Sequence, residues 1–451
     1  MSEVNTTKPP AGTRDFLPGD VKLREEAFAS VKRVFESYGF LPMETPAFER
    51  LEILMGKYGG EGERLIYKIL KRGEKGVIGE ADLALRYDLT IPLARVVAEY
   101  QHSLPSIFKR YQIGPVWRAD RPGKGRFREF YQCDIDTVGV SSIMADAEII
   151  LALSQALAAL RIDAFEVRLN SRKVLTALLD LYGVPAALRK GTVIAIDKID
   201  RVEIEEIKED LRAHGLSREM SETLAGDLGD PAAATRVRER LASSAIGRVG
   251  LGEVEEILEL VTPLIRGKVT FSPFLARGLE YYTGPVFEMY VKGTPLSIAS
   301  GGRYDNLIGM FSKRSIAACG GSLGIERIFM LLREQQGSSR EFPWIQVFVT
   351  VWAKEFRQDS LRLAAELRKS GMRCEVFLDE APIGHQLRMA SDKGASYAIL
   401  FGPDEKSRKE VTMKNLRARE QRSVREEEFV SFLLRSVNNE RESSHGHSDG
   451  R

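Results

Sequence analysis

Strand signals stop at residue 171 and return only near residue 268, and this gap limits the possible architectures. Residues 83–140 alternate as strands broken by turns do, with a helix at about 91–101, and strands resume over 268–300. Between them, residues 171–262 are helical in pattern and rich in charge. We therefore expect a sheet-containing core over residues 1–336, interrupted by a helical insertion at 171–262. A chain of 451 residues also exceeds what one hydrophobic core usually supports, so further domains are expected.

A second change in pattern follows residue 336. QGSSREFP is polar and ends in proline, which predicts a linker at 337–343. Beyond it strand and helix alternate, which is typical of a small α/β domain with a largely parallel sheet, here over 344–436. The segment 437–451 carries almost nothing apolar, and we expect a disordered tail there.

Composition excludes several classes of protein. The net charge of +2 gives no global basic field, so any RNA contact must come from local patches. Three cysteines lack CxxC spacing and five histidines form no HxxxH pair, so the sequence predicts neither a zinc site nor a disulfide framework. No run approaches the ~20 apolar residues of a membrane helix, and the N-terminus lacks the apolar core of a secretion signal. We expect a cytoplasmic protein.

The segment PVWRADRPGKGRFREFYQCDID predicts a strand, a tight basic loop and a second strand. On the second strand Gln132, Asp134 and Asp136 share one face, because successive side chains alternate. For an isolated strand such a face would simply be solvated. A nearby group of cations favours instead a site for a polyphosphate beside a cationic ligand group. These cations are Arg118, Arg121, Lys124, Arg126 and Arg128.

Two further segments share this character. In LALRYDLTIPLAR, Asp88 and Thr90 fall on one face of a short strand that runs into a helix, where they could hold an ammonium group or cap the helix. In CGGSLGIERIF, a glycine-rich turn at 319–324 precedes a helix with Arg327 in its first turn. An arginine at that end of a helix indicates a bound anion, although a plain surface arginine is the alternative. No P-loop or GxGxxG motif competes with these segments for a nucleotide.

Together with LARGLEYYTGPVFE at 275–288 and the following SGGRYDNLIG, these segments resemble class II aminoacyl-tRNA synthetases, and among them the histidyl-tRNA synthetases. The resemblance extends from PPAGTRDFLPGD to about residue 436. It implies an α+β catalytic core with a mixed, mainly antiparallel sheet, a helical insertion and a C-terminal α/β anticodon-binding domain. It also implies a homodimer, built through the first long helix at 20–38 and GFLPMETPAFE.

The resemblance further implies a two-step ligase reaction. Histidine and ATP, accompanied by Mg²⁺, form histidyl-adenylate, and the histidyl group then moves to the 3′ end of tRNA(His). No zinc and no organic cofactor are expected. The basic stretch 406–425 would contact tRNA, although a solvated charged face is the alternative for such a run. It contains Lys406, Arg408, Lys409, Lys414, Arg417, Arg419, Arg422 and Arg425.

Residue roles follow from the same resemblance. Arg277 matches the catalytic arginine, and Arg118 the arginine on the α-phosphate. Asp120 and Asp136 stand where the family often has glutamate. The positions that match ATP-binding residues are Arg118, Asp120, Arg126, Phe130 and Arg327. Those that match histidine-binding residues are Asp88, Thr90, Gln132, Asp136, Arg277, Tyr281 and Tyr282.

Two alternatives are weighed against this interpretation. One is the synthetase-like regulatory subunit of ATP phosphoribosyltransferase, which typically lacks the anticodon module and the arginine–tyrosine motif, both of which this sequence has. The other is a class IIa synthetase for another amino acid, such as threonine or proline, which RGLEYYTG and RYDNLIG disfavour.

Overall fold

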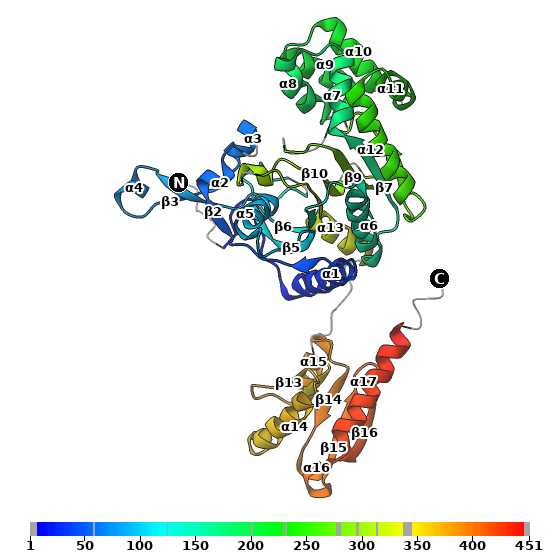
Figure 1. Cartoon of the computed structure of the whole chain (residues 1–451). Coiled ribbons are helices and arrows are strands. Elements are labelled where there is room, and N and C mark those ends of the chain that lie inside the picture. Colours follow the sequence, from blue (N-terminus) through cyan, green and yellow to red (C-terminus); the bar gives the residue numbers. More distant parts are fainter. Residues whose placement is uncertain are drawn as a thin grey trace. The chain divides into compact units, whose positions relative to one another are not determined.

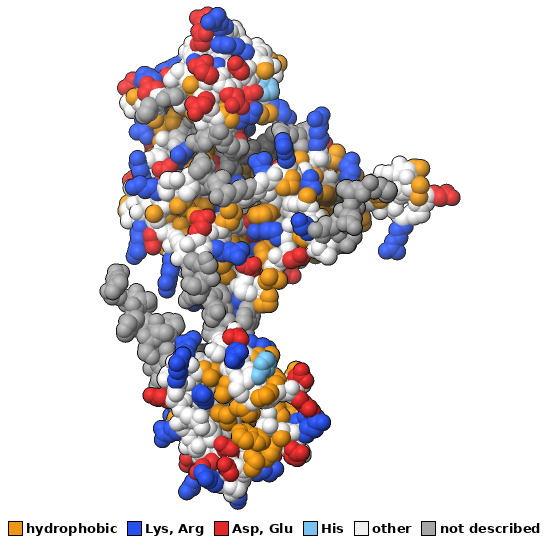
Figure 2. All heavy atoms as spheres, turned by 180° about the vertical axis from the view of Figure 1, so that it is seen from behind, with side chains coloured by type: hydrophobic (Ala, Val, Ile, Leu, Met, Phe, Trp, Pro, Cys, Tyr) orange, Lys and Arg blue, Asp and Glu red, His pale blue; other side chains and the backbone are white. Residues whose placement is uncertain are grey.

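The computed structural model describes residues 7–56, 59–123, 125–199, 202–228, 230, 232–276, 281–294, 297–312, 314–336 and 345–445. The chain forms two compact units, Met1–Gln335 and Gln336–Arg451, each with its own sheet (Figure 1). Lysine and arginine side chains are interspersed with acidic ones on the face shown in Figure 2, as the net charge of +2 suggests. In the described ranges, no helix has the length and apolar character needed to span a membrane.

An eight-stranded sheet forms the centre of the first unit. Its order is β1-β5-β6-β11-β10-β9-β7-β8, and every neighbouring pair is antiparallel except β1–β5 and β7–β8 at the two edges. The expected mixed, mainly antiparallel sheet is thereby confirmed. The strands are β1 (Leu41–Pro42), β5 (Phe108–Trp117), β6 (Glu129–Val138), β7 (Phe165–Ser171), β8 (Lys268–Phe271), β9 (Pro285–Val291), β10 (Ser297–Arg303) and β11 (Ala318–Leu323).

Two long helices pack against this sheet. α1 (Pro18–Ser37) packs on α6 (Ile143–Ala159), and α6 packs on β6 and β11. α6 is apolar on nearly all sides, so it is buried between α1 and the strands. α1 is followed by Gly39 at φ +79°, the left-handed position that the sequence predicts for this glycine.

A smaller group of elements closes one end of the opposite sheet face. α5 (Thr90–Tyr100) packs there with α2 (Leu51–Leu54) over Phe108, Val138 and Ala318 of the large sheet. By strand alternation these three residues share a face with Asp136. A three-stranded sheet lies beside α2, in the order β2 (Phe48–Arg50), β4 (Ala81–Leu85), β3 (Lys68–Leu70).

Helices fill the chain between β7 and β8. α12 packs along α6, α7 and β7, and the shorter helices gather with α7 in Figure 1 around a separate apolar cluster that includes Leu178, Ile207 and Leu241. Because β7 and β8 are neighbours, the helical segment leaves and rejoins the sheet at one edge. The helices are α7 (Arg172–Leu181), α8 (Arg189–Ile196), α9 (Ile204–Ala213), α10 (Arg218–Leu228), α11 (Ala233–Leu241) and α12 (Ala245–Val261).

The second unit has a mixed sheet in the order β13-β12-β14-β15-β16. Only β12–β13 and β12–β14 are parallel, so the expectation of a largely parallel sheet is wrong. α17 continues into the stretch 437–451, where composition predicts no ordered structure, and residues 446–451 lie outside the described residues. The elements are β12 (Val347–Val349), α14 (Arg357–Lys369), β13 (Cys374–Val376), α15 (Ile383–Asp392), β14 (Tyr397–Leu400), α16 (Pro403–Arg408), β15 (Glu410–Asn415), β16 (Glu420–Arg425) and α17 (Phe429–His445).

Two local expectations are also wrong. The glycine-rich stretch at 319–324 is mostly a strand, β11, rather than a turn, and α13 (Ile325–Gln336) follows it with Arg327 in the first turn. Asp88 and Thr90 lie beyond the end of β4, so they do not share a strand face. Asp88 instead accepts a hydrogen bond from the amide of Ile91 at 3.0 Å. This is the helix-capping contact that the sequence offered as the alternative for Asp88.

Candidate active site

A row of polar side chains follows one face of β6. Gln132, Asp134 and Asp136 point to this face because successive strand residues alternate. The register places Arg110 of β5 beside Asp136, and Ser322 of β11 beside Asp134. The expectation that these β6 residues share one face follows directly from alternation, whereas Arg110 was not among the residues that the sequence analysis selected.

Asp136 is enclosed by partners from the protein. Its Oδ2 lies 2.8 Å from Nη2 of Arg110, and its Oδ1 accepts a hydrogen bond from the hydroxyl of Tyr304. Burial raises the pKa of Asp136, while Arg110 and Tyr304 act to lower it. Removing one member of a buried ion pair leaves the other charge uncompensated, so Arg110 and Asp136 depend on each other.

Asp134 has weaker partners. Among the described residues it forms no ion pair, and its Oδ1 accepts a long hydrogen bond of 3.4 Å from Nε2 of Gln132. It also shares a hydrogen bond with the Ser322 side chain. Burial raises the pKa of Asp134 to about 7, although the charge of Arg110 acts to lower it. This carboxyl group can therefore gain or lose a proton near neutral pH.

Two tyrosines and the start of α5 form the wall beside these carboxyl groups. The rings of Tyr281 and Tyr282 are 5.0 Å apart between centroids, and Tyr281 shares a hydrogen bond with Thr90. Burial is the main cause that raises the pKa of both phenols, and the charges of Asp88 and Asp134 raise both further. The structure thus brings six of the expected histidine-binding positions together, while their roles stay a prediction: Asp88, Thr90, Gln132, Asp136, Tyr281 and Tyr282.

Glycines let these side chains lie close to the strands. A Cβ on Gly320 would lie 2.0 Å from Oδ1 of Asp136, and one on Gly302 would lie 3.0 Å from Cδ1 of Tyr282. The 2.0 Å approach is shorter than real Cβ contacts, so a side chain at Gly320 requires the carboxylate to move, whereas the 3.0 Å approach at Gly302 is a tight contact. The glycines of β10 and β11 therefore make the room that Asp136 and Tyr282 occupy.

The other end of β6 meets the basic loop. Nε of Arg118 donates to the carbonyl of Tyr87 at 3.0 Å, and its guanidinium lies over the rings of Tyr87 and Phe130 at 4.3 and 5.1 Å. Arg126 is exposed. Arg128 donates to the backbone oxygen of Asp120 at 3.1 Å, which fixes the loop rather than the Asp120 carboxylate. The loop cation at Lys124 lies outside the described residues.

The first turn of α13 is tied to β6 and α1. Glu326 accepts hydrogen bonds from the amide of Tyr131 at 3.2 Å and from the guanidinium groups of Arg24 and Arg14. Arg24 is buried, and aromatic rings surround it. The next residue, Arg327, donates to the backbone oxygen of Ser297 and lies against Gly125 of the basic loop. Sequence reasoning did not find the Glu326 contacts, since they join segments far apart in the chain.

Arg277 falls in residues 277–280, outside the described residues, but its neighbours on both sides are placed. Asn170 donates through Nδ2 to the backbone oxygens of Pro273 at 2.8 Å and Leu275 at 2.9 Å, which fixes the chain just before the arginine. On the other side Tyr281 is buried beside Thr90. The described residues on either side of Arg277 are therefore held by contacts of their own, and Tyr281 belongs to the wall of the site.

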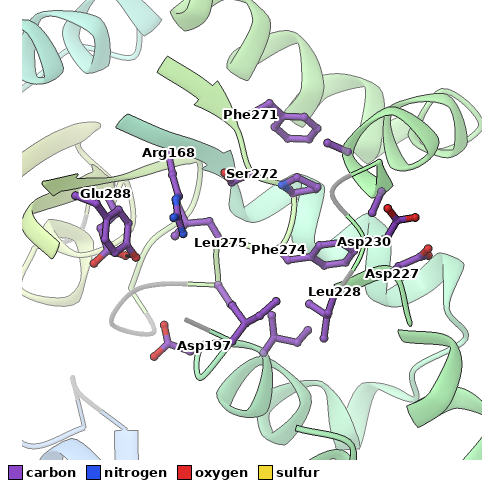
Figure 3. Close-up of a pocket in the computed structure, with 17 residues that line it drawn as sticks. Arg168, Asp197, Asp227, Leu228, Asp230, Phe271, Ser272, Phe274, Leu275 and Glu288 are labelled. Atoms are coloured by element: carbon purple, nitrogen blue, oxygen red, sulfur yellow. Dashed lines mark hydrogen bonds between the residues drawn. The ribbon is translucent and has the colours of Figure 1, made fainter. Parts of the chain in front are cut away.

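A cavity of about 350 Å³ lies on the same sheet face (Figure 3). Glu288 and Arg168 line it from β9 and β7, opposite Phe271 and Phe274. The Tyr290 hydroxyl donates to Glu288 at 2.7 Å. These residues were not among the candidate site residues expected from the sequence. In the part of the chain that the structure describes, no group of three or more His, Cys, Asp or Glu side chains is placed to hold a metal ion.

An antiparallel sheet with a basic loop between two of its strands, and a helix directly after its glycine-rich strand, is the arrangement of the class II aminoacyl-tRNA synthetases that the sequence resembles. Family models agree with this. The model described as histidyl-tRNA synthetase matches residues 12–328, and the one described as anticodon binding domain matches residues 346–436.

Individual relatives cover nearly the whole chain. A histidine–tRNA ligase of Cytophaga hutchinsonii is 38% identical over 448 residues, which cover 94% of this chain and 99% of the relative. The crystal structure of histidyl-tRNA synthetase from Nostoc sp. PCC 7120 is 29% identical, with a TM-score of 0.77 over 96% of this chain and 100% of that one. This chain belongs to the histidyl-tRNA synthetase family.

A third similar structure concerns the alternative that the chain is a regulatory subunit of ATP phosphoribosyltransferase. A structure from Bacillus halodurans described as an ATP phosphoribosyltransferase regulatory subunit/histidyl-tRNA synthetase has a TM-score of 0.69 and 24% identity, over 87% of this chain and 97% of that one. At that identity it shows a shared fold alone. The relatives named histidine–tRNA ligase, which match over almost their full length, do not favour the alternative.

Proposed function

We propose that this protein is a histidine–tRNA ligase, which activates histidine with ATP and transfers the histidyl group to the 3′ end of tRNA. Family membership supports this, and the observation that carries it at the site is the continuity of β6. One strand joins buried carboxyl groups and tyrosines at one end to a basic loop at the other. A cationic amino acid and a polyphosphate can therefore lie side by side.

In the first step a histidine carboxylate oxygen attacks the α-phosphorus of ATP. A new oxygen–phosphorus bond forms, the bond to the pyrophosphate leaving group breaks, and histidyl-adenylate results. Two anions must approach each other, so fixed cations lower the barrier most where charge builds up in the transition state. We assign this role to Arg118, which a carbonyl and two rings hold in place, and to Arg277.

At the histidine end of the site, we assign Asp88 and Thr90 to binding the amino group of histidine. We assign Gln132 and Arg277 to binding its carboxylate. Gln132 is half-buried, and its Oε1 has no hydrogen-bond partner among the described residues. Tyr281 and Tyr282 would close over the ligand. By the resemblance, Asp136 belongs at the imidazole end.

At the ATP end of the site, we assign Phe130 to stacking on the adenine, with Asp120 near this base. We assign Arg126 and Arg327 to binding the outer phosphates. By the resemblance, Mg²⁺ would arrive as part of MgATP. The absence of zinc and of an organic cofactor stays a prediction.

We expect the two domains to have different functions. We assign activation to residues 1–336, with the insertion at 171–262, and tRNA reading to 344–436 beyond a linker at 337–343. In the second unit, Arg417, Arg419 and Arg422 are exposed on or beside the β15–β16 hairpin. Exposed cations suit phosphate binding, and changing these three to glutamine should weaken tRNA charging at low salt while histidine activation persists.

A cytoplasmic homodimer is part of the same proposal. Leu41 is 56% exposed on the edge strand β1 and Phe48 is 51% exposed on β2, both in the GFLPMETPAFE segment. Large apolar side chains exposed in one short segment favour contact with a partner surface. Sedimentation of the full chain measures the oligomeric state.

Amino-acid-dependent exchange of pyrophosphate into ATP, measured across a panel of amino acids, tests the proposed activity. We expect exchange with histidine and at most trace exchange with threonine or proline. Arg277→His should lower adenylate formation about 100-fold or more while histidine and ATP still bind, because the lost contact acts mainly in the transition state. No exchange with any amino acid would favour the regulatory-subunit alternative, and selective exchange with another amino acid would favour the second.

A further inference from the structure

The first turn of α13 carries two neighbouring charged residues that point in different directions. Arg327, which we assign to the outer phosphates of ATP, lies against Gly125 of the basic loop and donates to the backbone oxygen of Ser297. Glu326 is buried and points instead toward α1 and β6. Consecutive residues leave a helix about 100° apart. Whatever fixes the Glu326 side chain therefore also fixes the rotation of the turn that presents Arg327.

Glu326 uses both of its carboxylate oxygens in contacts with other segments. Oε1 accepts hydrogen bonds from the amide of Tyr131 at 3.2 Å and from Nη1 of Arg24 at 3.2 Å. Oε2 accepts from the same Nη1 at 3.1 Å and from Nη2 of Arg14. Three segments that are far apart in the sequence therefore meet at one carboxylate: the chain just before α1, α1 itself, and β6.

Arg24 is held from several sides. It is buried, and its guanidinium lies 4.1 to 4.8 Å from the centroids of three aromatic rings. The rings belong to Phe16, Tyr131 and Phe329. Aromatic faces attract a guanidinium, so the rings add to the pull of the carboxylate. In the described ranges neither Arg24 nor Arg14 forms another ion pair, so both cations converge on Glu326 alone.

Stability alone does not explain this arrangement. Replacing a buried ion pair by apolar side chains of similar volume is often neutral for stability, and an apolar side chain would also pack among the rings around Arg24. What the charged contact adds is direction, because charge-assisted hydrogen bonds fix the orientation of the groups that they join. Arg327 needs such a fixed orientation, since an arginine fork binds phosphate oxygens only in a defined geometry.

From this geometry we propose that Arg24 and Arg14 are positioning residues for Arg327, acting through Glu326. They hold the first turn of α13 in the rotation at which the Arg327 guanidinium meets the outer phosphates of ATP. In this role neither arginine contacts the nucleotide. This inference rests on the proposed function, since it concerns the ATP end of the same site. It adds α1 and the segment before it to the elements that determine how ATP binds.

Arg24→Met in the full chain tests this role. It removes the cation and keeps a long side chain among the rings, while Arg14 still compensates Glu326. Titration calorimetry should show the Kd for MgATP raised about tenfold and the Kd for AMP changed less than about twofold, because AMP lacks the phosphates assigned to Arg327. The KM for histidine in pyrophosphate exchange should also change less than about twofold. Equal weakening of MgATP and AMP, or no change in either, would overturn the proposal.

Arg333→Met is the matched control on the same pair of helices. Nη2 of Arg333 lies 3.3 Å from Oδ1 of Asp20, so this variant also breaks an ion pair between α13 and α1. The Arg333 side chain is 66% exposed and lies two turns beyond Arg327, so MgATP and AMP should bind as they do to wild type. If Arg333→Met weakened MgATP as much as Arg24→Met, any loosening of α13 would suffice, and the Glu326 contact would have no special role.

A double-variant cycle separates positioning from a general loss of structure. In an Arg327→Met background, Arg24→Met should change the Kd for MgATP by less than about twofold, because the group that it positions is already gone. A tenfold effect that persists in that background would contradict the inference.

Arg14→Met keeps the question decidable if Arg24→Met fails to fold. The Arg14 side chain is partly exposed, so its loss should raise the Kd for MgATP about threefold and leave that for AMP unchanged. Unselective weakening, or none, would count against the proposal. Wild-type protein that binds MgATP but shows no histidine-dependent exchange would remove the proposed function, and the binding comparisons would still decide the inference.

Discussion

The charged groups at the two ends of β6 lie in opposite environments. Around Asp136 the charged groups are buried and pair with each other, so protein contacts set their geometry before any ligand arrives. Around the 118–128 loop the described cations face solvent or are held by backbone oxygens and aromatic rings, as Arg118 is. Substitution at the buried end should therefore reduce stability as well as activity, whereas substitution at the loop should reduce activity alone.

Gly320→Ala should have the largest effect, because it breaks the buried end directly. The new Cβ would lie 2.0 Å from Oδ1 of Asp136 and 2.7 Å from the backbone oxygen of Ile135, so strand and carboxylate cannot both stay in place. We expect histidine-dependent exchange to fall more than about 100-fold and stability to fall by about 3 kcal/mol. Gly309→Ala is the control, since nothing approaches its Cβ closer than 3.5 Å. Equal behaviour of the two variants in exchange and urea unfolding would refute the packing argument.

Arg110→Met should cost about 3–5 kcal/mol in the free energy of unfolding at pH 7.5, since it leaves the Asp136 carboxylate buried without its cation. Adding Asp136→Asn should recover part of this loss, because the uncompensated charge is then gone. Urea unfolding of the single and double variants measures the coupling. Arg417→Met removes an exposed arginine and should change stability by less than about 0.5 kcal/mol. Strictly additive losses in the double variant would mean that the pair is not coupled.

Asp134 should also make stability depend on pH. Its pKa is about 7 when folded against 3.8 as the ordinary value, so the folded protein binds the proton more tightly. Stability from this group is therefore present below pH 4 and is lost as pH rises to about 7, by at most about 4 kcal/mol. Asp134→Asn should remove that slope, which unfolding measured between pH 4.5 and 7.5 would show. A slope identical to wild type would contradict the assigned pKa shift.

Arg118→Lys tests the exposed end of β6, at the 118–128 loop. It keeps the charge but loses the planar fork that suits a phosphate, so we expect kcat/KM for ATP to fall roughly tenfold to hundredfold. The free energy of unfolding should change by less than about 1 kcal/mol, because Arg118 has no buried carboxylate partner in the described structure. A loss of stability as large as that of Arg110→Met would erase the proposed difference between the two ends.

Sequence alone could predict the residues that lie on one strand, but not most of the partners from other strands. Alternation is local, so Gln132, Asp134 and Asp136 were found together. The contact from Arg110 depends on the register between β5 and β6, and the one from Tyr304 joins residues 168 positions apart. Neither leaves a signal in hydrophobic periodicity.

Glycine and turn chemistry account for the wrong expectations. Glycines of 319–324 predicted a turn, yet within β11 their missing side chains make room for Asp136 and for Leu153 of α6. In the second unit the β15–β16 hairpin has no Asn-Gly or Asp-Gly signal, and Arg419 takes the left-handed conformation at φ +59° instead. Without that signal the final antiparallel strand was missed, and the sheet was expected to be largely parallel.

Hydrogen–deuterium exchange of the full chain, with histidine alone and with MgATP alone, tests most directly whether the two ends of β6 hold different substrates. The account predicts that histidine slows exchange of peptides covering 86–91 and 281–284, and that MgATP slows exchange of peptides covering 118–128. Histidine protection confined to 118–128, or the same protection pattern with either ligand, would contradict the division of the site into a buried amino-acid end and an exposed phosphate end.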